Sequence, residues 1–378
     1  MNNKSKFLSV NWMQGMSVSS SHFIDTENYL LERILQNMSL VQGSFMYGLL
    51  PETNDQSSLS LLLRGVGNRS ILVLESFRGL LPGGYLLLLD DLGESVSCPC
   101  ETEGEVSEEG WDVVLSVSPF DRNPCGTPDL QETPPRYPFV EPTYKLGIVA
   151  RTKKEPNKYG PYAVVIGLLR KKESTYVLDS NYIPPSLTMS SQCELQSYMD
   201  SFSSRISVIN ETVGIVMEKA MSQSNRSQIM DCVLLVCKEL KRNISSFYFH
   251  WRNNAYNLSP YQITEILSGL ANAVLTSLSF LPKKDKEEML KYFYEWNGVS
   301  PSSFEQMLEE VVNKPYNHNR IRQSLLGVDG VIQTLEELFV SLSHLDFVGQ
   351  HKENIVISVS EKQKATSVTN SSGWLVVD

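Results

Sequence analysis

The most reactive side chains of this sequence are its five histidines and six cysteines, which could hold a metal ion or supply a nucleophile. A Cys-x-x-Cys pair, or two histidines four residues apart on a helix, would bring such groups together. Neither spacing occurs. The sequence therefore predicts no metal site, and it predicts free thiols in a reducing compartment. The residues concerned are His22, His250, His318, His344, His351, Cys98, Cys100, Cys125, Cys193, Cys232 and Cys237.

A second group of motifs would indicate nucleotide binding or hydrolysis. The nearest match, Gly65-Val66-Gly67-Asn68-Arg69-Ser70, lacks the third glycine of the dinucleotide fingerprint and is interpreted as a hairpin turn. The motifs GxxxxGK[ST], GxSxG and HExxH do not occur. We therefore predict no catalytic residue, no cofactor and no enzyme. The open alternative is an active site assembled from distant residues, which would leave no motif of this kind.

The composition is that of an ordinary folded protein. Hydrophobic residues make up 41% of the 378 residues and charged residues 20%, which excludes a disordered chain. The net charge of -10 repels phosphate backbones, so nucleic acid is excluded as a partner. No apolar run approaches the roughly 20 residues that cross a bilayer, and the N-terminus lacks a stretch of signal-peptide type. We expect a cytoplasmic protein without membrane insertion.

Two segments are expected to lie outside regular structure. Nine acidic residues and no Lys or Arg occur from Asp90 to Asp112. This acidic segment, 90–112, is expected to be a solvated loop or hairpin tip, and the alternative is a docking surface for a basic partner. Prolines are dense from Pro119 to Pro142, and they predict an irregular connection because proline fits poorly in strands and helices.

The sequence changes character near residue 188. Before it, short apolar runs separated by turn residues predict strands, with one amphipathic segment at 23–35; after it, apolar residues repeat at helical spacing. We predict an α+β multidomain protein with a β-sandwich-like domain over 1–188, a long-helix bundle over 189–343 and a short tail over 344–378. The predicted strands are 59–63, 70–74, 85–89, 111–117, 145–150, 163–169 and 175–178, and the predicted helices are 195–220, 229–251, 260–281, 285–297, 301–314 and 321–342.

Apolar residues of two predicted helices recur in alternating steps of three and four, which is typical of a coiled-coil seam. Such a seam forms either the core of an intramolecular bundle or a contact between subunits. Two strict runs on long helices favour the contact between subunits. The predicted oligomer seam contains Leu195, Met199, Phe202, Ile206, Ile209, Val213, Val216, Ile321, Leu325, Val328, Ile332 and Leu335.

The run over residues 10–23 resembles the opening of the TssK family, the baseplate subunits of bacterial type VI secretion systems. The shared residues are Trp12, Gly15 and Met16 in the pattern Trp-x-x-Gly-Met, followed by His22 and Phe23. Two serines stand where the family usually has Pro-Gln. Three later motifs follow in the family's order: Tyr182-Ile183-Pro184-Pro185, Ser259-Pro260-Tyr261 and Pro315-Tyr316-Asn317-His318.

Resemblance to this family implies a homotrimer with a β-rich shoulder (1–188), a helical neck (189–343) and a C-terminal head. It implies that the shoulder binds TssF and TssG, the wedge proteins of the baseplate, and that the head links the baseplate to the membrane complex of TssL and TssM. The resemblance covers residues 5–343, and the tail is too short for that head. Contact with a membrane-complex protein is then expected through another adaptor or through the tail, which ends in Trp374-Leu375-Val376-Val377.

We therefore expect a structural baseplate component at the cytoplasmic face of the bacterial inner membrane. Trp12, Gly15, Met16, His22 and Phe23 are the candidate residues for binding the wedge proteins, because large apolar side chains near a chain end can anchor in a partner's pocket. The alternative for these side chains is closure of the shoulder's own core. The alternative for the protein is another phage-tail-like trimeric scaffold or adaptor with the same architecture.

Overall fold

The computed structural model describes residues 5–53, 57–66, 69–90, 96–100, 109–151, 159–172, 175–223 and 225–352. The chain divides into two compact units, and neither is continuous in sequence. The first unit comprises Met1–Met199, Asn254–Ile263 and Tyr316–Leu325. The second comprises Asp200–Asn253, Thr264–Pro315 and Leu326–Asp378. The change from strands to helices that the sequence places near residue 188 lies between the last strand and the first long helix of the second half.

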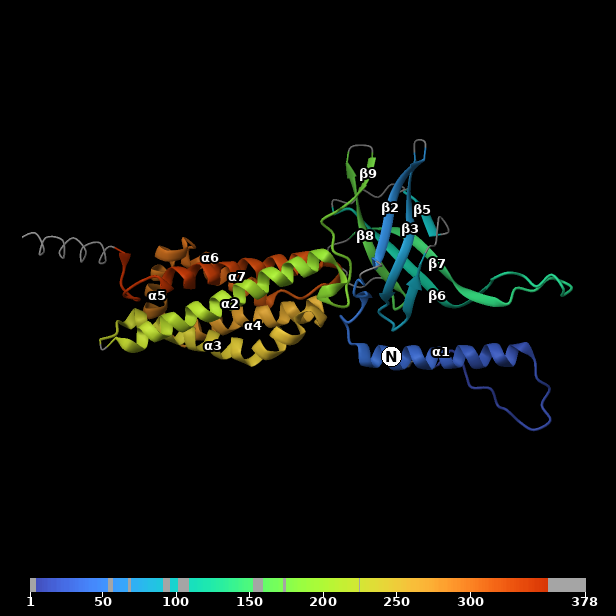
Figure 1. The fold of residues 1–378 in the computed structure, drawn as a ribbon, viewed down its shortest axis with the longest axis horizontal. Coiled ribbons are helices and arrows are strands. Elements are labelled where there is room, and N and C mark those ends of the chain that lie inside the picture. The colour runs from blue at the N-terminus through green and yellow to red at the C-terminus, as the bar shows by residue number, and fades with distance from the viewer. Residues whose placement is uncertain are drawn as a thin grey trace, which may run out of the picture. The chain divides into compact units, whose positions relative to one another are not determined.

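The first unit is built on two antiparallel sheets that pack as a sandwich (Figure 1). In one sheet the strand order is β1-β3-β2, and β4 and β5 also pair with β3. In the other the order is β7-β6-β8-β9. The strands are β1 (Gly48–Leu49), β2 (Leu59–Val66), β3 (Arg69–Leu80), β4 (Leu86–Leu89), β5 (Val96–Pro99), β6 (Trp111–Cys125), β7 (Phe139–Ala150), β8 (Ala163–Lys172) and β9 (Thr175–Leu178).

The core of the first unit lies between these sheets. Leu72 and Leu74 of β3 share one buried apolar cluster with Val113 and Leu115 of β6, and the alternate spacing within each pair puts both members on one face of the strand. The predicted α+β class is confirmed, and each of the seven predicted strands is present. The Gly65–Ser70 motif lies at the β2–β3 hairpin, as expected, because Val66 pairs with Arg69.

Both segments that were expected to be irregular contain strands. β6 extends to Cys125 and β7 begins at Phe139, so both ends of the proline-rich segment are strands of one hairpin, and the expectation of an irregular connection is wrong for them. Residues 126–138, between the two strands, are irregular as expected. The ladder tolerates proline because its register shifts between Ser118 and Asn123 and because β7 is at a sheet edge. In the acidic segment, which was expected to be a loop or hairpin tip, Val96–Pro99 form β5 and pair with β3, so that expectation is wrong for these four residues. Residues 91–95 and 101–108 of that segment lie outside the described residues.

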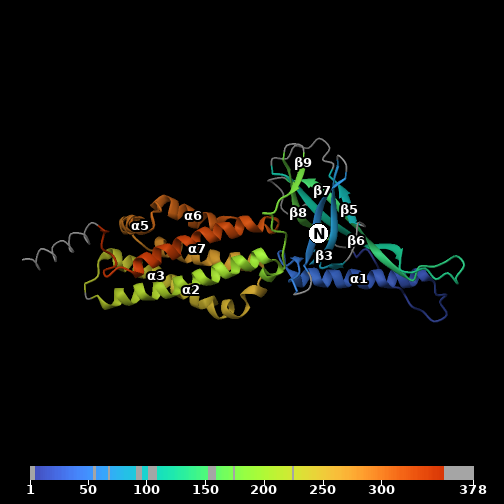
Figure 2. The same ribbon diagram turned by 45° about the horizontal axis from the view of Figure 1, so that its top comes forward.

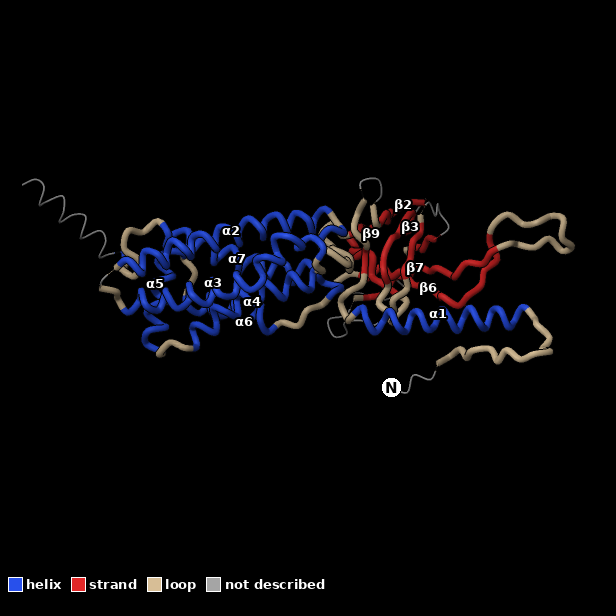
Figure 3. Tube along the Cα trace, turned by 60° about the horizontal axis from the view of Figure 1, so that its bottom comes forward, coloured by secondary structure: helices blue, strands red, loops and turns tan. Residues whose placement is uncertain are grey.

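The second unit is a helical bundle (Figures 2 and 3). Its helices are α3 (Gln228–Asn254), α5 (Lys283–Asn297), α6 (Pro301–Asn313) and most of α2 (Cys193–Ser222), α4 (Pro260–Ser279) and α7 (Ile321–Ser343). Arg205 of α2 is paired with Asp329 of α7 at 2.7 Å, and Lys241 of α3 donates to the carbonyl oxygen of Asn210 on α2 at 2.7 Å. All six predicted helices are present, and none of the described helices is long and apolar enough to cross a bilayer.

The described part of the tail packs on the second unit. Val348 is buried, the Gly349 amide donates to the Tyr292 hydroxyl at 3.0 Å, and His351 contacts the carboxylate of Glu295 at 2.6 Å. The apolar end of the tail at 374–377 lies outside the described residues.

Candidate protein-interaction site

Helix α1 (Ser20–Gln42; Figure 1) carries the candidate residues His22 and Phe23, and the other three, Trp12, Gly15 and Met16, lie in the segment before it. The start of α1 follows from a local hydrogen-bond pattern. The Ser19 amide donates to Nδ1 of His22 at 3.2 Å. In return, the Ser19 hydroxyl oxygen faces the backbone amide of His22, which is the third residue of the helix. This is a capping box in which histidine takes the place usually held by Glu or Gln. The backbone geometry therefore gives His22 a structural task that the sequence motif did not reveal.

One face of α1 is fixed to the sandwich. Leu35 is buried, and the Gln42 side-chain amide donates to the carbonyl oxygen of Leu81 at 3.1 Å. Gly84, whose φ is 82°, lies so close to the helix that a Cβ there would be 2.5 Å from Cβ of Met38. The turn at Leu81–Gly84 thus needs glycine at position 84 for both its backbone angle and its contact with α1.

The segment before α1 is held by a carboxylate of the same helix. Glu32 accepts hydrogen bonds from the Ser5 hydroxyl at 2.6 Å, the Lys6 amide at 2.9 Å and the Phe7 amide at 3.0 Å. Desolvation acts to raise the pKa of Glu32, but these hydrogen bonds and the neighbouring Arg33 hold the pKa below its usual value. The ionised carboxylate therefore ties the N-terminal segment to α1.

Trp12, from the segment before α1, lies beside His22 and Phe23 of the first turn of the helix. The Trp12 ring centroid is 6.1 Å from that of His22 and 6.2 Å from that of Phe23. Trp12 is 50% exposed and Phe23 is 58% exposed, so these two side chains do not close the sandwich core, which excludes that alternative for them. Gly15 provides the turn with a φ of 82°, and Met16 is half-buried. The motif forms an exposed apolar cluster, and we call Trp12, His22 and Phe23 the N-terminal cluster.

The exposed side of α1 continues from this cluster as a stripe of apolar side chains. Phe23, Leu30, Ile34 and Val41 recur in steps of 7, 4 and 7, which keeps them on one helix face. Each is at least 53% exposed. Sequence reasoning recognised only the amphipathic segment 23–35 and missed this stripe, although the heptad-like spacing was present. We call these four residues the α1 stripe.

The β6–β7 hairpin adjoins the N-terminal end of α1. Arg122 of β6 is paired with Glu27 of α1 at 2.6 Å, and Phe120 lies 4.7 Å from Phe7 between ring centroids. The far part of this hairpin carries further exposed apolar side chains, among them Leu130 and Phe139. An extended apolar surface of this kind is typical of a protein-binding site.

The residues of the predicted oligomer seam are buried inside the chain and are not exposed like the α1 stripe. All twelve of the seam's side chains are no more than 1% exposed within a single chain. They therefore have no surface left for a neighbouring subunit, and their assignment as an oligomer seam is wrong; the intramolecular alternative holds. A heptad pattern specifies a helical partner but does not specify whether that partner belongs to the same chain. These residues are Leu195, Met199, Phe202, Ile206, Ile209, Val213, Val216, Ile321, Leu325, Val328, Ile332 and Leu335.

Two later motifs of the sequence meet inside the first unit. The Phe45 ring stacks on Tyr261 at 4.8 Å and meets Tyr316 edge-on at 5.1 Å. His318 is buried beside Tyr47, and burial lowers its pKa to about 4. The motif at Tyr182–Pro185 is also held in this unit, because the Leu49 amide donates to the carbonyl oxygen of Pro185 at 2.8 Å. These motifs build the fold rather than a reactive surface.

The described parts of the chain contain no group of three or more His, Cys, Asp or Glu side chains arranged to hold a metal ion. The six cysteines are free, and Cys193 is the exposed one. The geometry thus offers surfaces for other proteins, and these surfaces are concentrated at α1.

Comparison with known proteins identifies the fold. No family model matches the sequence, and no curated protein matches it. A crystal structure of TssK is similar with a TM-score of 0.50 and 14% identity, over 86% of this chain and 69% of that chain. The chain has the TssK fold.

Two further structures were matched. A chain of a type VI secretion system TssK-TssF-TssG baseplate subcomplex has 13% identity and a TM-score of 0.43, over 88% of this chain and 100% of that chain. A baseplate complex of the type VI secretion system has 14% identity and a TM-score of 0.47, over 87% of this chain and 69% of that chain. The TssK fold agrees with the order of strands and helices described above.

Proposed function

We propose that this protein is a structural, non-enzymatic component of a type VI secretion (contractile injection) baseplate. The observation that carries the proposal is the exposed N-terminal cluster, which a TssK-like fold presents on a helix fixed to the sandwich. Aromatic anchors held on a rigid element lose little entropy on binding, and such residues dominate protein interfaces. The proposed role is an adaptor that connects the baseplate wedge to the cell-envelope complex.

The proposed partners of the N-terminal cluster are TssF- and TssG-like wedge proteins. Support comes from the motif that carries the family resemblance, because its Trp12 and Phe23 are the residues that the fold leaves exposed. Burying two such side chains in a partner's pocket stabilises a complex by several kcal/mol, at roughly 1.5–3 kcal/mol for each large apolar side chain.

The proposed homotrimer requires a surface other than the buried seam. The α1 stripe supplies one, because Leu30, Ile34 and Val41 are exposed and keep the spacing of a helix–helix contact. Location at the cytoplasmic face of the inner membrane, and contact of the tail 344–378 with a membrane-complex protein, belong to the same proposal.

The test is co-purification of the full chain with cognate TssF and TssG. The double variant Trp12→Ala with Phe23→Asp is expected to lose the wedge proteins. Leu326→Asp, which changes an equally exposed apolar residue of α7, is the matched control and is expected to retain them. Failure of the unmodified protein to bind the wedge, or equal binding by the double variant, would overturn the proposal.

A further inference from the structure

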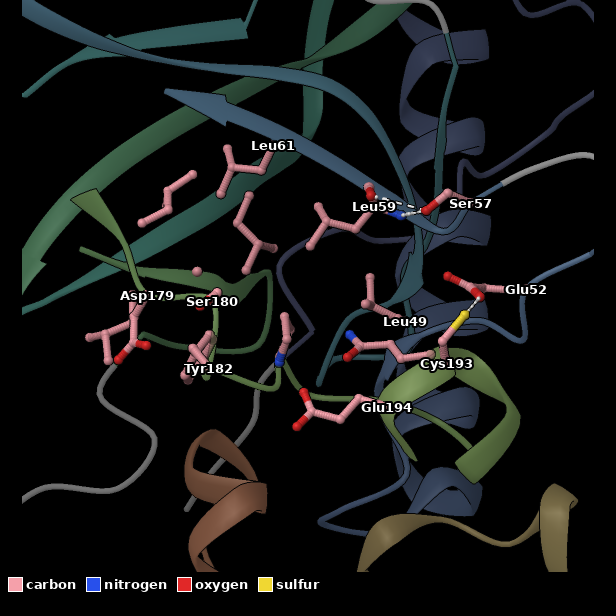
Figure 4. A pocket seen from close by; sticks show the side chains of 16 residues that line it. Leu49, Glu52, Ser57, Leu59, Leu61, Asp179, Ser180, Tyr182, Cys193 and Glu194 are labelled. Atoms are coloured by element: carbon pink, nitrogen blue, oxygen red, sulfur yellow. Dashed lines mark hydrogen bonds between the residues drawn. The ribbon is translucent and has the colours of Figure 1, made fainter. Parts of the chain in front are cut away.

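A cavity of about 380 Å³ lies in the first unit, and none of its lining residues belongs to α1 (Figure 4). Its floor is aliphatic and comes from both sheets, with Leu59 and Leu61 of β2, Ile166 and Leu168 of β8 and Leu178 at the end of β9. The size lies in the lower part of the range of ligand pockets, about 300–1,000 Å³. The cavity can therefore accept one or two apolar side chains.

Glycine and a bulge shape this floor. A Cβ at Gly167 would lie 2.9 Å from Cδ2 of Leu61, so glycine lets β8 approach β2 at this point. The pairing of β6 with β8 shifts register between Val113 and Val114, where Ile166 is the extra residue. A bulge of this kind redirects side chains and is common beside functional sites.

The cavity is bordered by strands at the ends of their sheets. Among the described residues, β2 is hydrogen-bonded to β3 alone, and β9 is hydrogen-bonded to β8 alone. The outer edge of β2 thus carries backbone donors and acceptors next to an apolar cavity. An extended peptide satisfies such an edge by adding a strand, with its side chains reading the neighbouring pocket.

Three carboxylates stand at the rim, and two of them are already paired. Asp179 accepts from Arg170 at 2.6 Å, and Glu194 pairs with Arg322. Burial acts to raise the pKa of Asp179, but the hydrogen bonds from Arg170 and from the Asn181 amide hold it below its usual value. Both groups are therefore neutralised by their own arginines.

Glu52 is the third carboxylate, and its situation differs. Within the described part of the chain its side chain has only the Cys193 thiol as a partner, at 3.5 Å, and Cys193 is exposed at the same rim (Figure 4). Its backbone is fixed, because the Glu52 amide donates to the carbonyl oxygen of Ser190 at 3.3 Å. A carboxylate held beside an aliphatic cavity favours a ligand that carries a cationic group near its apolar group, and it disfavours an anionic ligand.

We propose that this cavity is a second docking site, which binds an extended segment of a partner protein that carries an aliphatic side chain two residues away from a lysine or arginine, so that both side chains lie on the same face of the added strand. The aliphatic side chain enters the leucine-lined floor, the basic side chain pairs with Glu52, and the main chain pairs with the outer edge of β2. This inference goes beyond the baseplate proposal and does not depend on it, since it uses neither the N-terminal cluster nor the α1 stripe.

The test selects peptides from a phage-displayed library of random heptapeptides on the full chain and then measures the synthetic winners. The expected winners carry an aliphatic residue two positions away from Lys or Arg and slow the reaction of Cys193 with a maleimide. Cys98 and Cys125 are partly accessible and can also react with the maleimide. The variant Cys193→Ser therefore shows which part of the measured reaction belongs to Cys193. Glu52→Lys is expected to weaken binding by about tenfold, since it places like charges together, and Glu52→Gln is expected to weaken it less.

Glu309→Lys, at an exposed carboxylate of α6, is the charge-matched control and is expected to bind the peptides normally. Winners that leave Cys193 reactivity unchanged, or that bind Glu52→Lys as tightly as the unmodified chain, would overturn the proposal. Faster reaction of Cys193 in a full chain with Ile355→Asp and Ile357→Asp would show that the chain's own tail occupies the cavity, which would overturn the assignment to a partner.

Discussion

Nε2 of His318 lies 2.8 Å from the backbone carbonyl oxygen of Tyr47, and this contact joins segments that are 271 residues apart in the sequence. A carbonyl oxygen can only accept, so Nε2 carries the proton. Nδ1 is then free to accept from the Tyr316 hydroxyl, which lies 2.9 Å away. Both ring nitrogens are used by the neutral imidazole, and a second proton would make Nδ1 a donor, so that the Tyr316 hydroxyl could no longer donate to it.

This arrangement predicts a stability that falls in mild acid. Burial lowers the pKa of His318 from 6.5 to about 4, so the unfolded chain binds a proton more readily than the folded one between these values. The contribution of His318 to the free energy of unfolding is complete above pH 6.5. It decreases as the pH falls toward 4, by about 1.4 kcal/mol per pH unit. Urea unfolding at pH 7.5 and 5.0 measures it. His318→Gln, which does not titrate, should show a smaller loss between the two pH values; an equal loss would contradict the assignment.

The capping box at Ser19 predicts an unusual substitution pattern at His22. His22→Gln should preserve the start of α1, since Gln is a usual partner in such a box, whereas His22→Ala should cost about 1 kcal/mol of helix stability. Hydrogen exchange of the first turn of α1 provides the measurement. Equal protection in the two variants would show that the side chain does not cap the helix.

The buried seam predicts unfolding rather than dissociation when it is disrupted. Ile206→Asp places a charge where the side chain is 1% exposed, and we expect a loss above about 4 kcal/mol together with lost helical circular dichroism. Ile206→Val should cost only about 1 kcal/mol. Ile215→Asp, on the exposed side of the same helix, is the control. A folded Ile206→Asp monomer would restore the intersubunit assignment.

The α1 stripe predicts that self-association can be removed without unfolding. Light scattering of the unmodified protein should give the mass of three chains, against 42.6 kDa for one. Leu30→Asp with Ile34→Asp should reduce the mass toward one chain and leave circular dichroism unchanged, because both side chains are exposed. Phe280→Asp in the second unit should have no effect on mass. A trimer that persists in the double variant would assign the contact to another surface.

Gly48 predicts a large effect from one methyl group. Its φ is 114°, and a Cβ there would lie 2.1 Å from the carbonyl carbon of Pro185, so Gly48→Ala should cost more than about 3 kcal/mol. Gly298→Ala is the matched control, since its φ is also positive but a Cβ would meet nothing within 4 Å; strain alone should cost about 1–2 kcal/mol. Thermal unfolding compares the two, and similar losses would show that the contact with Pro185 yields easily.

Local signals in the sequence predicted most elements but not their tertiary partners. The start of α4 is an example. Ser259-Pro260-Tyr261-Gln262 combines a capping residue, a proline at the first helical position and a glutamine at the third, and the Ser259 amide donates to the Gln262 side chain at 2.9 Å. β1 was missed because a strand of two residues is too short to show an alternating apolar pattern. Only the pairing of Gly48 and Leu49 with β3 defines it. The seam was misassigned because a helical period does not identify the chain that supplies the partner. The α1 stripe was missed because Glu27 and Asn37 interrupt its apolar pattern.

The first unit includes Asn254–Ile263 and Tyr316–Leu325, which bring Tyr261 and His318 to the aromatic contacts around Phe45 and Tyr47. During synthesis on the ribosome, the sandwich strands emerge long before these residues are translated. The side chains of Phe45 and Tyr47 in the nascent sandwich therefore stay without these contacts until residue 325 has left the exit tunnel. Folding of the first unit is thereby coupled to completion of nearly the whole chain, and a stalled or shortened product would present an apolar surface to chaperones and proteases.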